Sequence, residues 1–173
     1  MSAQAAFRTK ILFDTNQLLQ RAKSEEEILS QTASQLMKLL NRSLIVYPEQ
    51  NGDLGAEQVF EIDGEVPCNI FSAPEERDAA NWTFANKKRS GAGTDSYPDA
   101  KGLYLALRTG GGVFGVIGID LSEKPLDAFE NSVLLSILGE GALAIENRRN
   151  ALEKEQAALQ ARNEELRANL LRT

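Results

Sequence analysis

Residues 91–118 read GAGTDSYPDAKGLYLALRTGGGVFGVIG, and this run contains the clearest structural signal in the chain. From Leu103 onward leucines alternate with other residues, and a second β-rich run begins at Val113 after three consecutive glycines. Alternation with a period of two is typical of strands, and a glycine-rich turn between two strands is typical of an antiparallel hairpin. The first part of the run lies in a stretch without periodicity, residues 88–101, which predicts a long loop.

Two helices are predicted at the N-terminal end of the chain. Apolar residues between Phe7 and Leu19 recur at helical spacing, which predicts an amphipathic helix before about residue 22. Ser24 and Glu27 have the spacing of a capping box, in which side chains accept hydrogen bonds from free backbone N–H groups. We therefore expect a second helix from about residue 25 to residue 41.

Short strands and a third helix are predicted between these helices and the loop. The β-rich runs at 44–47 and 59–62 are separated by turn residues, and residues 69–71 predict a third, shorter strand. Pro74 is followed by two acidic residues, which is typical of a helix start. This helix is expected to reach about residue 87.

The C-terminal part of the chain predicts one long helix. No proline follows residue 126, and a helix from there to the end would be about 70 Å long at 1.5 Å per residue. Because a small domain is narrower than that, the far end must project. Five aliphatic residues recur at intervals of seven, as d positions of a coiled coil do. They are Leu138, Ile145, Leu152, Leu159 and Leu166. The companion positions Arg149, Gln156 and Asn163 are polar, so we expect a weak parallel homodimer.

The composition excludes several kinds of chemistry. The sequence contains no histidine and a single cysteine, Cys68. A Ser-His-Asp triad needs an imidazole and ordinary zinc sites need clustered histidines and cysteines, so neither can form from this chain. The formal net charge of −6 opposes nucleic-acid binding. Uninterrupted apolar runs fall short of the roughly 18–20 residues that span a bilayer. We expect no catalytic residue, metal site or cofactor, and no direct membrane span.

Other motifs have simple structural interpretations. The glycines of 110–115 match the spacing of a dinucleotide-binding fingerprint, but that mechanism needs a helix after the glycines, and a β-rich run follows instead. Cys68 has no cation nearby in sequence, so we interpret it as a buried small hydrophobic residue. The acidic pairs at 25–26 and 75–76 are interpreted as stabilising helix N-termini.

The loop at 88–101 is the segment with the composition of a binding site. Its two glycines would let backbone N–H groups face a ligand, and a hydroxyl, a carboxylate and three upstream cations lie close in sequence. The alternative is that Thr94 and Asp95 only fold the loop through bonds to the backbone. The candidate ligand-binding residues are Trp82, Arg89, Gly91, Gly93, Thr94, Asp95 and Tyr104.

Four motifs together resemble the GAF domain of KdpD-type sensor histidine kinases. They are Trp82-x-Phe84, Gly91-Ala92-Gly93-Thr94-Asp95-x-x-Pro98, Leu103-Tyr104-Leu105-x-Leu107 and Gly115-Val116-Ile117-Gly118. The resemblance covers about residues 78–120. It implies an α+β fold of the GAF type, in which an antiparallel sheet has helices packed on one side and long helices at both ends. The implied domains are an N-terminal signalling helix (1–23), a GAF domain (24–147) and a coiled-coil signalling helix (148–173).

The resemblance also implies a function for the chain. It would be a cytoplasmic sensory fragment, with no enzyme activity of its own, of a kinase anchored in the bacterial inner membrane. The parent would respond to potassium or osmotic stress, bind ATP and phosphorylate a response regulator, through a histidine beyond Thr173. The fragment would form a homodimer and bind an unidentified small ligand or ion. The alternatives are a ligand-free dimerisation spacer and a small-molecule reductase of the GAF-like kind.

Overall fold

A computed structural model describes residues 2–62 and 69–172. The long C-terminal helix, the hairpin and the two N-terminal helices all form where the sequence predicts them. The elements are α1 (Ala3–Arg21), α2 (Glu25–Leu40), β1 (Leu44–Gln50), β2 (Asp53–Leu54), β3 (Gln58–Phe60), the 3-10 turn η1 (Ile70–Ser72), α3 (Pro74–Asn86), β4 (Ser90–Gly91), β5 (Gly102–Thr109), β6 (Gly112–Asp120) and α4 (Ala128–Leu171).

The strands form one antiparallel sheet in the order β2-β1-β6-β5-β4, and β3 also pairs with β1. The hairpin of β5 and β6 lies at its centre. In β6, Gly118 lies opposite Tyr104 on one side and Ile45 on the other. A Cβ atom at Gly118 would lie 2.4 Å from the Tyr104 ring and 2.7 Å from Ile45, so a residue without a side chain is needed there.

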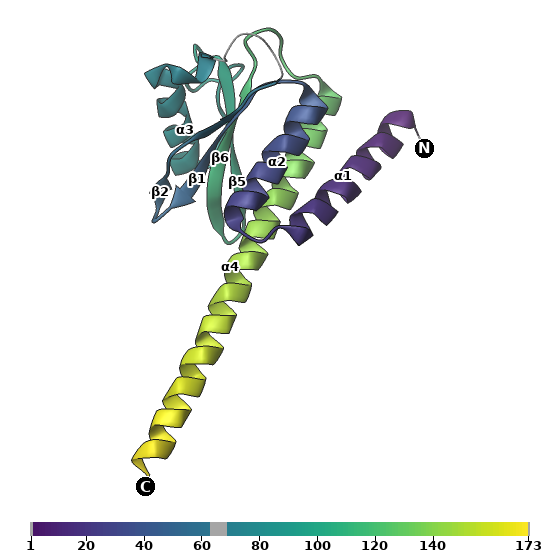
Figure 1. The fold of residues 1–173 in the computed structure, drawn as a ribbon. Helices are drawn as coiled ribbons and strands as arrows, with labels where there is room; N and C mark the ends of the chain where they lie inside the picture. The colour runs from purple at the N-terminus through teal and green to yellow at the C-terminus, as the bar shows by residue number, and fades with distance from the viewer. Residues whose placement is uncertain (1, 63–68, 173) are drawn as a thin grey trace.

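The sheet is covered on both faces, so the prediction that helices pack on one side is wrong. Figure 1 shows α3 on one face, α2 and α4 on the other, and α1 outside α2 and α4. The strands are buried on both faces: Leu103, Leu105 and Leu107 belong to the core under α2 and α4, whereas Tyr104 and Val116 belong to the core under α3. The second face of β5, which carries Tyr104, is therefore also buried, and α3 covers it.

The structure differs from the sequence prediction in two short segments. Residues 69–71 do not form a strand, because Ile70–Ser72 is a 3-10 turn that leads into α3. Within the predicted loop, Ser90–Gly91 forms a two-residue strand on the edge of β5. The predicted burial of Cys68 lies outside the described residues.

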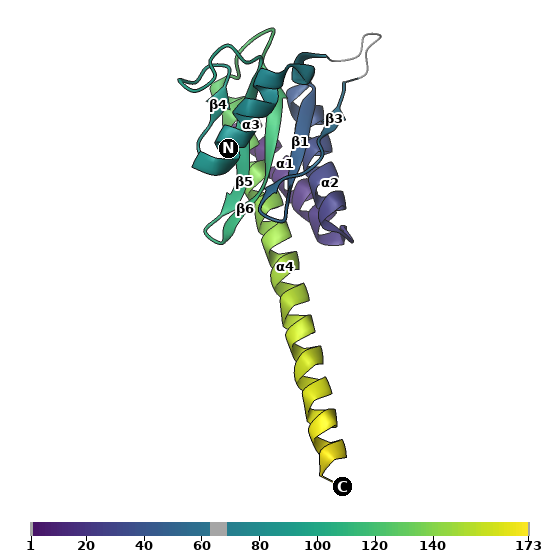
Figure 2. The same ribbon diagram turned by 90° about the vertical axis from the view of Figure 1, so that its left-hand side faces the viewer.

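Helix α4 has two different halves. Up to Ile145 one face packs in the core, and from residue 150 to residue 172 every residue is exposed. Figure 2 shows this second half projecting away from the sheet and the other helices. An 18-residue window of α4 is apolar enough to cross a membrane by composition, and 39% of that window is buried within the fold. The first half of α4 packs against the sheet and α2. The apolar composition of this half is therefore that of a helix in the core of a domain.

Candidate functional site

The loop that carries most of the predicted ligand-binding residues is folded onto itself. The Thr94 hydroxyl lies 2.8 Å from the carbonyl oxygens of both Gly91 and Ser96, and Gly91 N–H donates to Ser96 across the same turn. Gly91 has a φ of +94° and Gly93 a φ of +79°, which glycine adopts readily. Thr94 therefore holds the loop by bonds to its backbone, which is what the structural alternative predicts for this residue, and both glycines supply backbone conformations that the loop needs.

A buried carboxylate ties this loop to helix α3. Glu76 is 2% exposed and accepts hydrogen bonds from the N–H groups of Lys101 and Gly102, at 3.0 and 2.9 Å. It also accepts a 2.8 Å hydrogen bond from the Tyr104 hydroxyl. Burial and then the hydrogen bond to Glu76 hold the pKa of Tyr104 well above its ordinary value. Tyr104 therefore stays protonated and acts as a permanent donor in this network.

The predicted site residues do not converge on one cavity. Gly91 and Tyr104 are brought together by the pairing of β4 with β5, and Thr94 lies in the turn beside them. Trp82 is half-buried on α3, whereas Arg89 and Asp95 are exposed. Glu76 is absent from the predicted set because its position in the first turn of α3 suggests only a helix-stabilising acid. No group of three potential metal ligands occurs among residues 2–62 and 69–172.

Aromatic side chains fill the space between α3 and the sheet. Tyr47, Tyr104 and Phe71 are 1%, 0% and 6% exposed and belong to the same core cluster. The Arg77 guanidinium lies 5.1 Å from the centre of the Tyr47 ring. Burial, followed by the charge of Glu57, raises the pKa of Tyr47 to about 12, although Arg77 opposes the shift. This interface is a packed core, and the grooves described below lie on the other side of the sheet.

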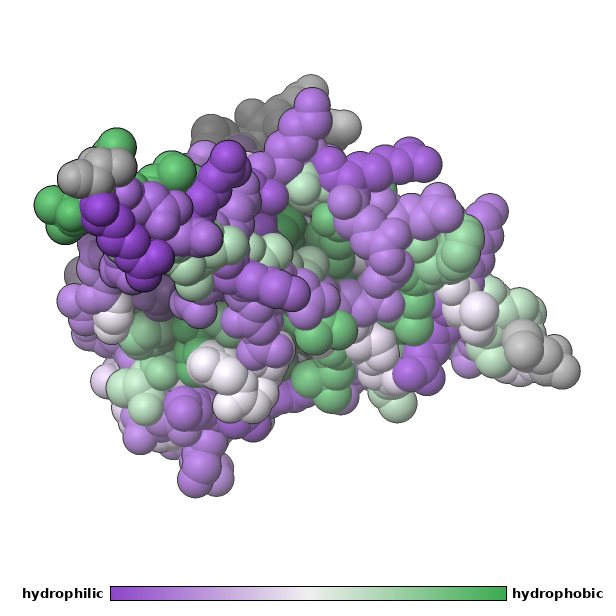
Figure 3. Space-filling model, turned by 90° about the horizontal axis from the view of Figure 1, so that it is seen from below, coloured by the Kyte–Doolittle hydropathy of each residue, from purple (hydrophilic) through white to green (hydrophobic). Residues whose placement is uncertain are grey.

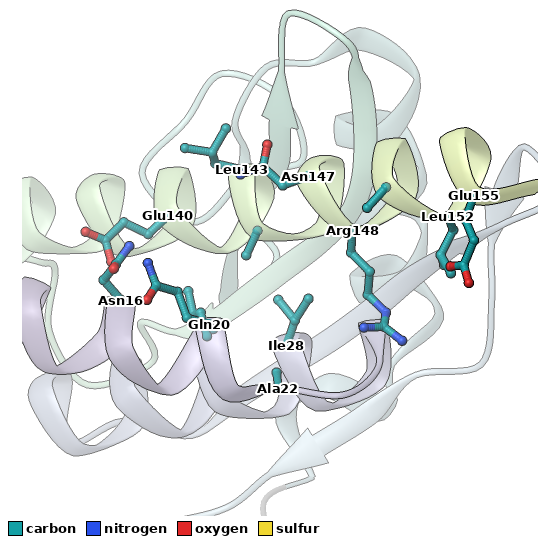
Figure 4. Close-up of a pocket in the computed structure, with 13 residues that line it drawn as sticks. Asn16, Gln20, Ala22, Ile28, Glu140, Leu143, Asn147, Arg148, Leu152 and Glu155 are labelled. Atoms are coloured by element: carbon teal, nitrogen blue, oxygen red, sulfur yellow. The ribbon is translucent and has the colours of Figure 1, made fainter. Parts of the chain in front are cut away.

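A groove of about 590 Å³ runs between α1 and α4. Figure 4 shows Glu140 of α4 in this groove beside Asn16 and Gln20 of α1, with Leu143 and Leu152 further along the same helix. One carboxylate oxygen of Glu140, Oε2, is buried and has no hydrogen-bond partner among residues 2–62 and 69–172. Burial raises the pKa of Glu140 above its ordinary value. The groove thus contains a carboxylate whose charged form is poorly solvated.

We expect Glu140→Gln to raise the melting temperature at neutral pH. Burial raises the pKa of Glu140 in the folded state. Below the pKa of the unfolded state, about 4.3, the carboxyl is protonated in both states and its charge does not affect the free energy of unfolding. Above the folded-state pKa the carboxylate is charged in both states, and its burial lowers the free energy of unfolding most. The stability of the parent should therefore fall relative to the variant as pH increases from about 4 to 8. Arg148 and Glu155, the other charged groups that line the groove, are the same in both proteins. Melting curves that remain parallel over this pH range would contradict the expectation.

Arg149 binds two acidic residues where α4 leaves the domain. Its Nε lies 2.6 Å from Oε1 of Glu25 at the start of α2, and its Nη1 lies 2.8 Å from Oε2 of Glu49 in β1. The guanidinium also lies 5.1 Å from the centre of the Phe114 ring in β6. Burial raises the pKa of Glu49, but the Gly52 N–H and Arg149 outweigh it and hold that pKa below its ordinary value. One side chain of α4 is thus bonded to both the sheet and α2.

The five residues predicted for dimerisation occupy two environments. Leu138 and Ile145 are 4% and 0% exposed because they pack in the core of their own chain. Leu152, Leu159 and Leu166 are 44%, 59% and 54% exposed on the projecting half of α4. The view from below shows exposed apolar surface as separate green areas within a mostly purple surface (Figure 3). An interface in the predicted register therefore has its first free leucine at Leu152.

Comparison with known proteins gives relatives in sequence and in structure. No family model matches the chain. The chain is 31% identical over 167 residues to the sensor protein KdpD of Clostridium acetobutylicum, in a match that covers 96% of this chain and 19% of that protein. The chain thus spans about a fifth of the length of the curated relative that it matches.

Many solved structures share the fold, including the following two. The GAF domain of the potassium sensor histidine kinase KdpD from Escherichia coli has a TM-score of 0.61 at 22% identity, over 87% of this chain and 99% of that chain. The GAF domain of a phosphoenolpyruvate-protein phosphotransferase from Acinetobacter has a TM-score of 0.58 at 12% identity, over 87% of this chain and 97% of that chain. At these identities the structural likeness establishes the fold.

Proposed function

Because this chain is a GAF domain of the kind found in KdpD-type sensor histidine kinases, we propose that it is a regulatory domain whose output is α4. One observation carries this proposal. α4 is a single helix of 44 residues, packed in the core at its beginning and fully exposed at its end. A continuous helix has no flexible joint between these halves, so a displacement of the core half is transmitted to the projecting half.

Arg149 supports this proposal because it lies at the boundary between the two halves. Its ion pairs join α4 to Glu25 of α2 and Glu49 of β1. A change in how α2 or β1 packs would therefore change the position of α4 where it leaves the domain. In a two-state description, a signal acts by favouring one packing arrangement of α4 over another.

The parent of this chain would be a longer kinase. Its kinase core would bind ATP and phosphorylate a response regulator, and this domain would change that reaction without catalysing it. The Escherichia coli neighbour is the GAF domain of a potassium sensor histidine kinase, which supports potassium as the input of the parent. The domain itself would lie in the cytoplasm, attached to a parent in the bacterial inner membrane.

The projecting half of α4 would associate with the same segment of a second copy as a parallel coiled coil. Leu152, Leu159 and Leu166 supply the d positions, and Gln156 and Asn163 lie at the companion positions. Polar residues at those positions weaken a coiled coil and restrict its register. The dimer would therefore be adjustable by the packing of the domain above it.

The dimer is tested by replacing leucines on the projecting half. In sedimentation equilibrium, Leu152→Asn/Leu159→Asn is expected to raise the dimer dissociation constant by at least about tenfold, because each copy loses two apolar side chains from the interface. The control is Leu171→Asn, which removes an exposed leucine outside the d positions of the same helix. If the double variant and the control associate like the parent chain, the interface lies elsewhere.

The second candidate function is a dimerisation spacer that binds no ligand. The observation in its favour is the filled interface between α3 and the sheet, where Tyr47 and Tyr104 are buried. A thermal-shift screen with potassium chloride, nucleotides and small metabolites distinguishes the two candidates. A shift beyond that given by sodium chloride of equal ionic strength supports a sensor, and its absence supports the spacer.

A further inference from the structure

A basic groove lies at the open edge of the sheet, where the first residues of the loop at 88–101 meet β5 and α4. It has a volume of about 240 Å³ and is bounded by the segment between α3 and β4, by β5 and by α4. Lys87, Lys88 and Arg89 approach it from one side, and Arg108 of β5 approaches it from another. These cations come from two parts of the chain, so the fold brings them together.

The charges around this basic groove are all of one sign. Each ionisable residue that lines it is a lysine or an arginine. None of the four takes part in an ion pair within residues 2–62 and 69–172. This concentration of positive charge occurs in a chain whose formal net charge is −6. Unpaired like charges repel one another, and a bound anion would relieve that repulsion.

The backbone of β5 adds a donor to the same groove. β4 pairs with β5 only at Tyr104 and Leu103, so the edge of β5 beyond them has no strand partner. The carbonyl of Gly102 accepts from Ala92 on this edge, and backbone groups alternate between the two edges of a strand. The N–H group of Ala106 therefore points to the open edge.

An apolar surface adjoins the cations. Leu135 of α4 lines the groove with Leu105 and Leu138; it is 48% exposed, whereas the other two leucines are buried. Arginine binds phosphate oxygens through a planar fork, and lysine binds them as a compact charge. The groove therefore offers several phosphate donors and one apolar contact.

We propose that this basic groove binds a small soluble molecule that carries phosphate groups. The phosphates would lie between Arg108 and the Lys87–Arg89 segment, with the Ala106 N–H as an additional donor. The rest of the molecule would contact Leu135. Since Leu135 belongs to α4, the ligand would contact the proposed output helix, but binding itself does not depend on that output.

The test uses inorganic pyrophosphate as the probe and the complete chain at constant ionic strength. In a ¹⁵N-labelled sample, we expect saturable shifts of the backbone amides of residues 87–89 and 105–108, including Ala106. Lys88→Gln/Arg108→Gln is expected to weaken binding by at least about tenfold, because each lost charge-assisted hydrogen bond contributes about that factor. Both side chains are exposed, so the fold should be unchanged.

The control variant is Arg162→Gln/Arg167→Gln, which makes the same change in net charge on the projecting half of α4. It should bind pyrophosphate like the parent chain. The proposal is overturned if sodium chloride of equal ionic strength reproduces the shifts, or if the groove variant and the control bind equally well. It is also overturned if the chain binds vesicles containing phosphatidic acid and pyrophosphate does not compete. The Leu152→Asn/Leu159→Asn variant should still bind, so a failed dimer and a failed groove are distinguishable.

Discussion

Glu76→Ala is expected to lower the free energy of unfolding by at least about 3 kcal/mol, because three hydrogen-bond donors lose their acceptor at a cost of about 1–3 kcal/mol each. The carboxylate of Glu76 accepts from the N–H groups of Lys101 and Gly102 and from the Tyr104 hydroxyl. Removing it leaves three donors without their acceptor, and two of these hydrogen bonds are buried. A domain of this size has a total stability of roughly 5–15 kcal/mol, so the loss is a large fraction of it.

Glu75 provides the matched control for this experiment. It precedes Glu76 in the first turn of α3 and is exposed, so Glu75→Ala removes only a favourable charge near the helix N-terminus. Urea unfolding followed by circular dichroism should give a much smaller loss for Glu75→Ala. Glu76→Gln should lie between the two, because the amide keeps one acceptor oxygen. Equal losses at the two positions would show that Glu76 acts only through the helix N-terminus.

The role of Glu76 shows what the sequence could not predict. Its three donors lie 25, 26 and 28 residues away along the chain. A helix start with two adjacent acids has the same local pattern whether an acid faces water or the core. By contrast, the hairpin and α4 were predictable because their signals are local periodicities. Contacts between distant segments leave no such pattern in a single sequence.

Leu138 and Ile145 show a second limit of periodicity. Leucines at intervals of seven mark a helix face that becomes buried, but the spacing is the same whether that face packs on its own domain or on a partner. In α4 the face is continuous: Leu138 and Ile145 pack in the core, and Leu152 continues the stripe on the projecting half. The spacing therefore gives no information on the partner: Leu138 and Ile145 are buried by their own chain, and not by a second copy as predicted.

The candidate loop was the segment whose composition most suggested a ligand. Its hydroxyl and glycines are used to fold it, because Thr94 donates within the loop and Gly91 pairs with Leu103. Of the three cations upstream of the glycines, only Arg89 was among the predicted ligand-binding residues. Their common position in the basic groove depends on Arg108, which the hairpin brings near them. In the fold, the residues of this segment are divided between two places: Thr94 and Gly91 hold the loop, and Arg89 lines the basic groove.

Gly91→Ala is expected to destabilise the domain by about 2–5 kcal/mol. Its φ of +94° disfavours any side chain, and an added Cβ would lie 2.0 Å from the carbonyl oxygen of Gly102. The positive φ alone costs about 1–2 kcal/mol. The remainder is the cost of displacing the Gly102 backbone, which the added Cβ would otherwise overlap. Because Gly102 is also held by Glu76, that displacement must strain the buried network as well.

A substitution at Gly93 distinguishes the cost of a positive φ from the cost of a steric collision. Its φ is +79°, yet an added Cβ would have no atom within 4 Å, so Gly93→Ala keeps the backbone strain without the collision. We expect a loss of about 1–2 kcal/mol for Gly93→Ala and at least about twice that for Gly91→Ala. Hydrogen exchange of the Lys101 and Gly102 amides should accelerate more in the Gly91 variant than in the Gly93 variant. The expectation is contradicted if both variants lower the free energy of unfolding equally and leave hydrogen exchange of the Lys101 and Gly102 amides unchanged. In that case the hydrogen bonds of Glu76 do not position the loop on α3.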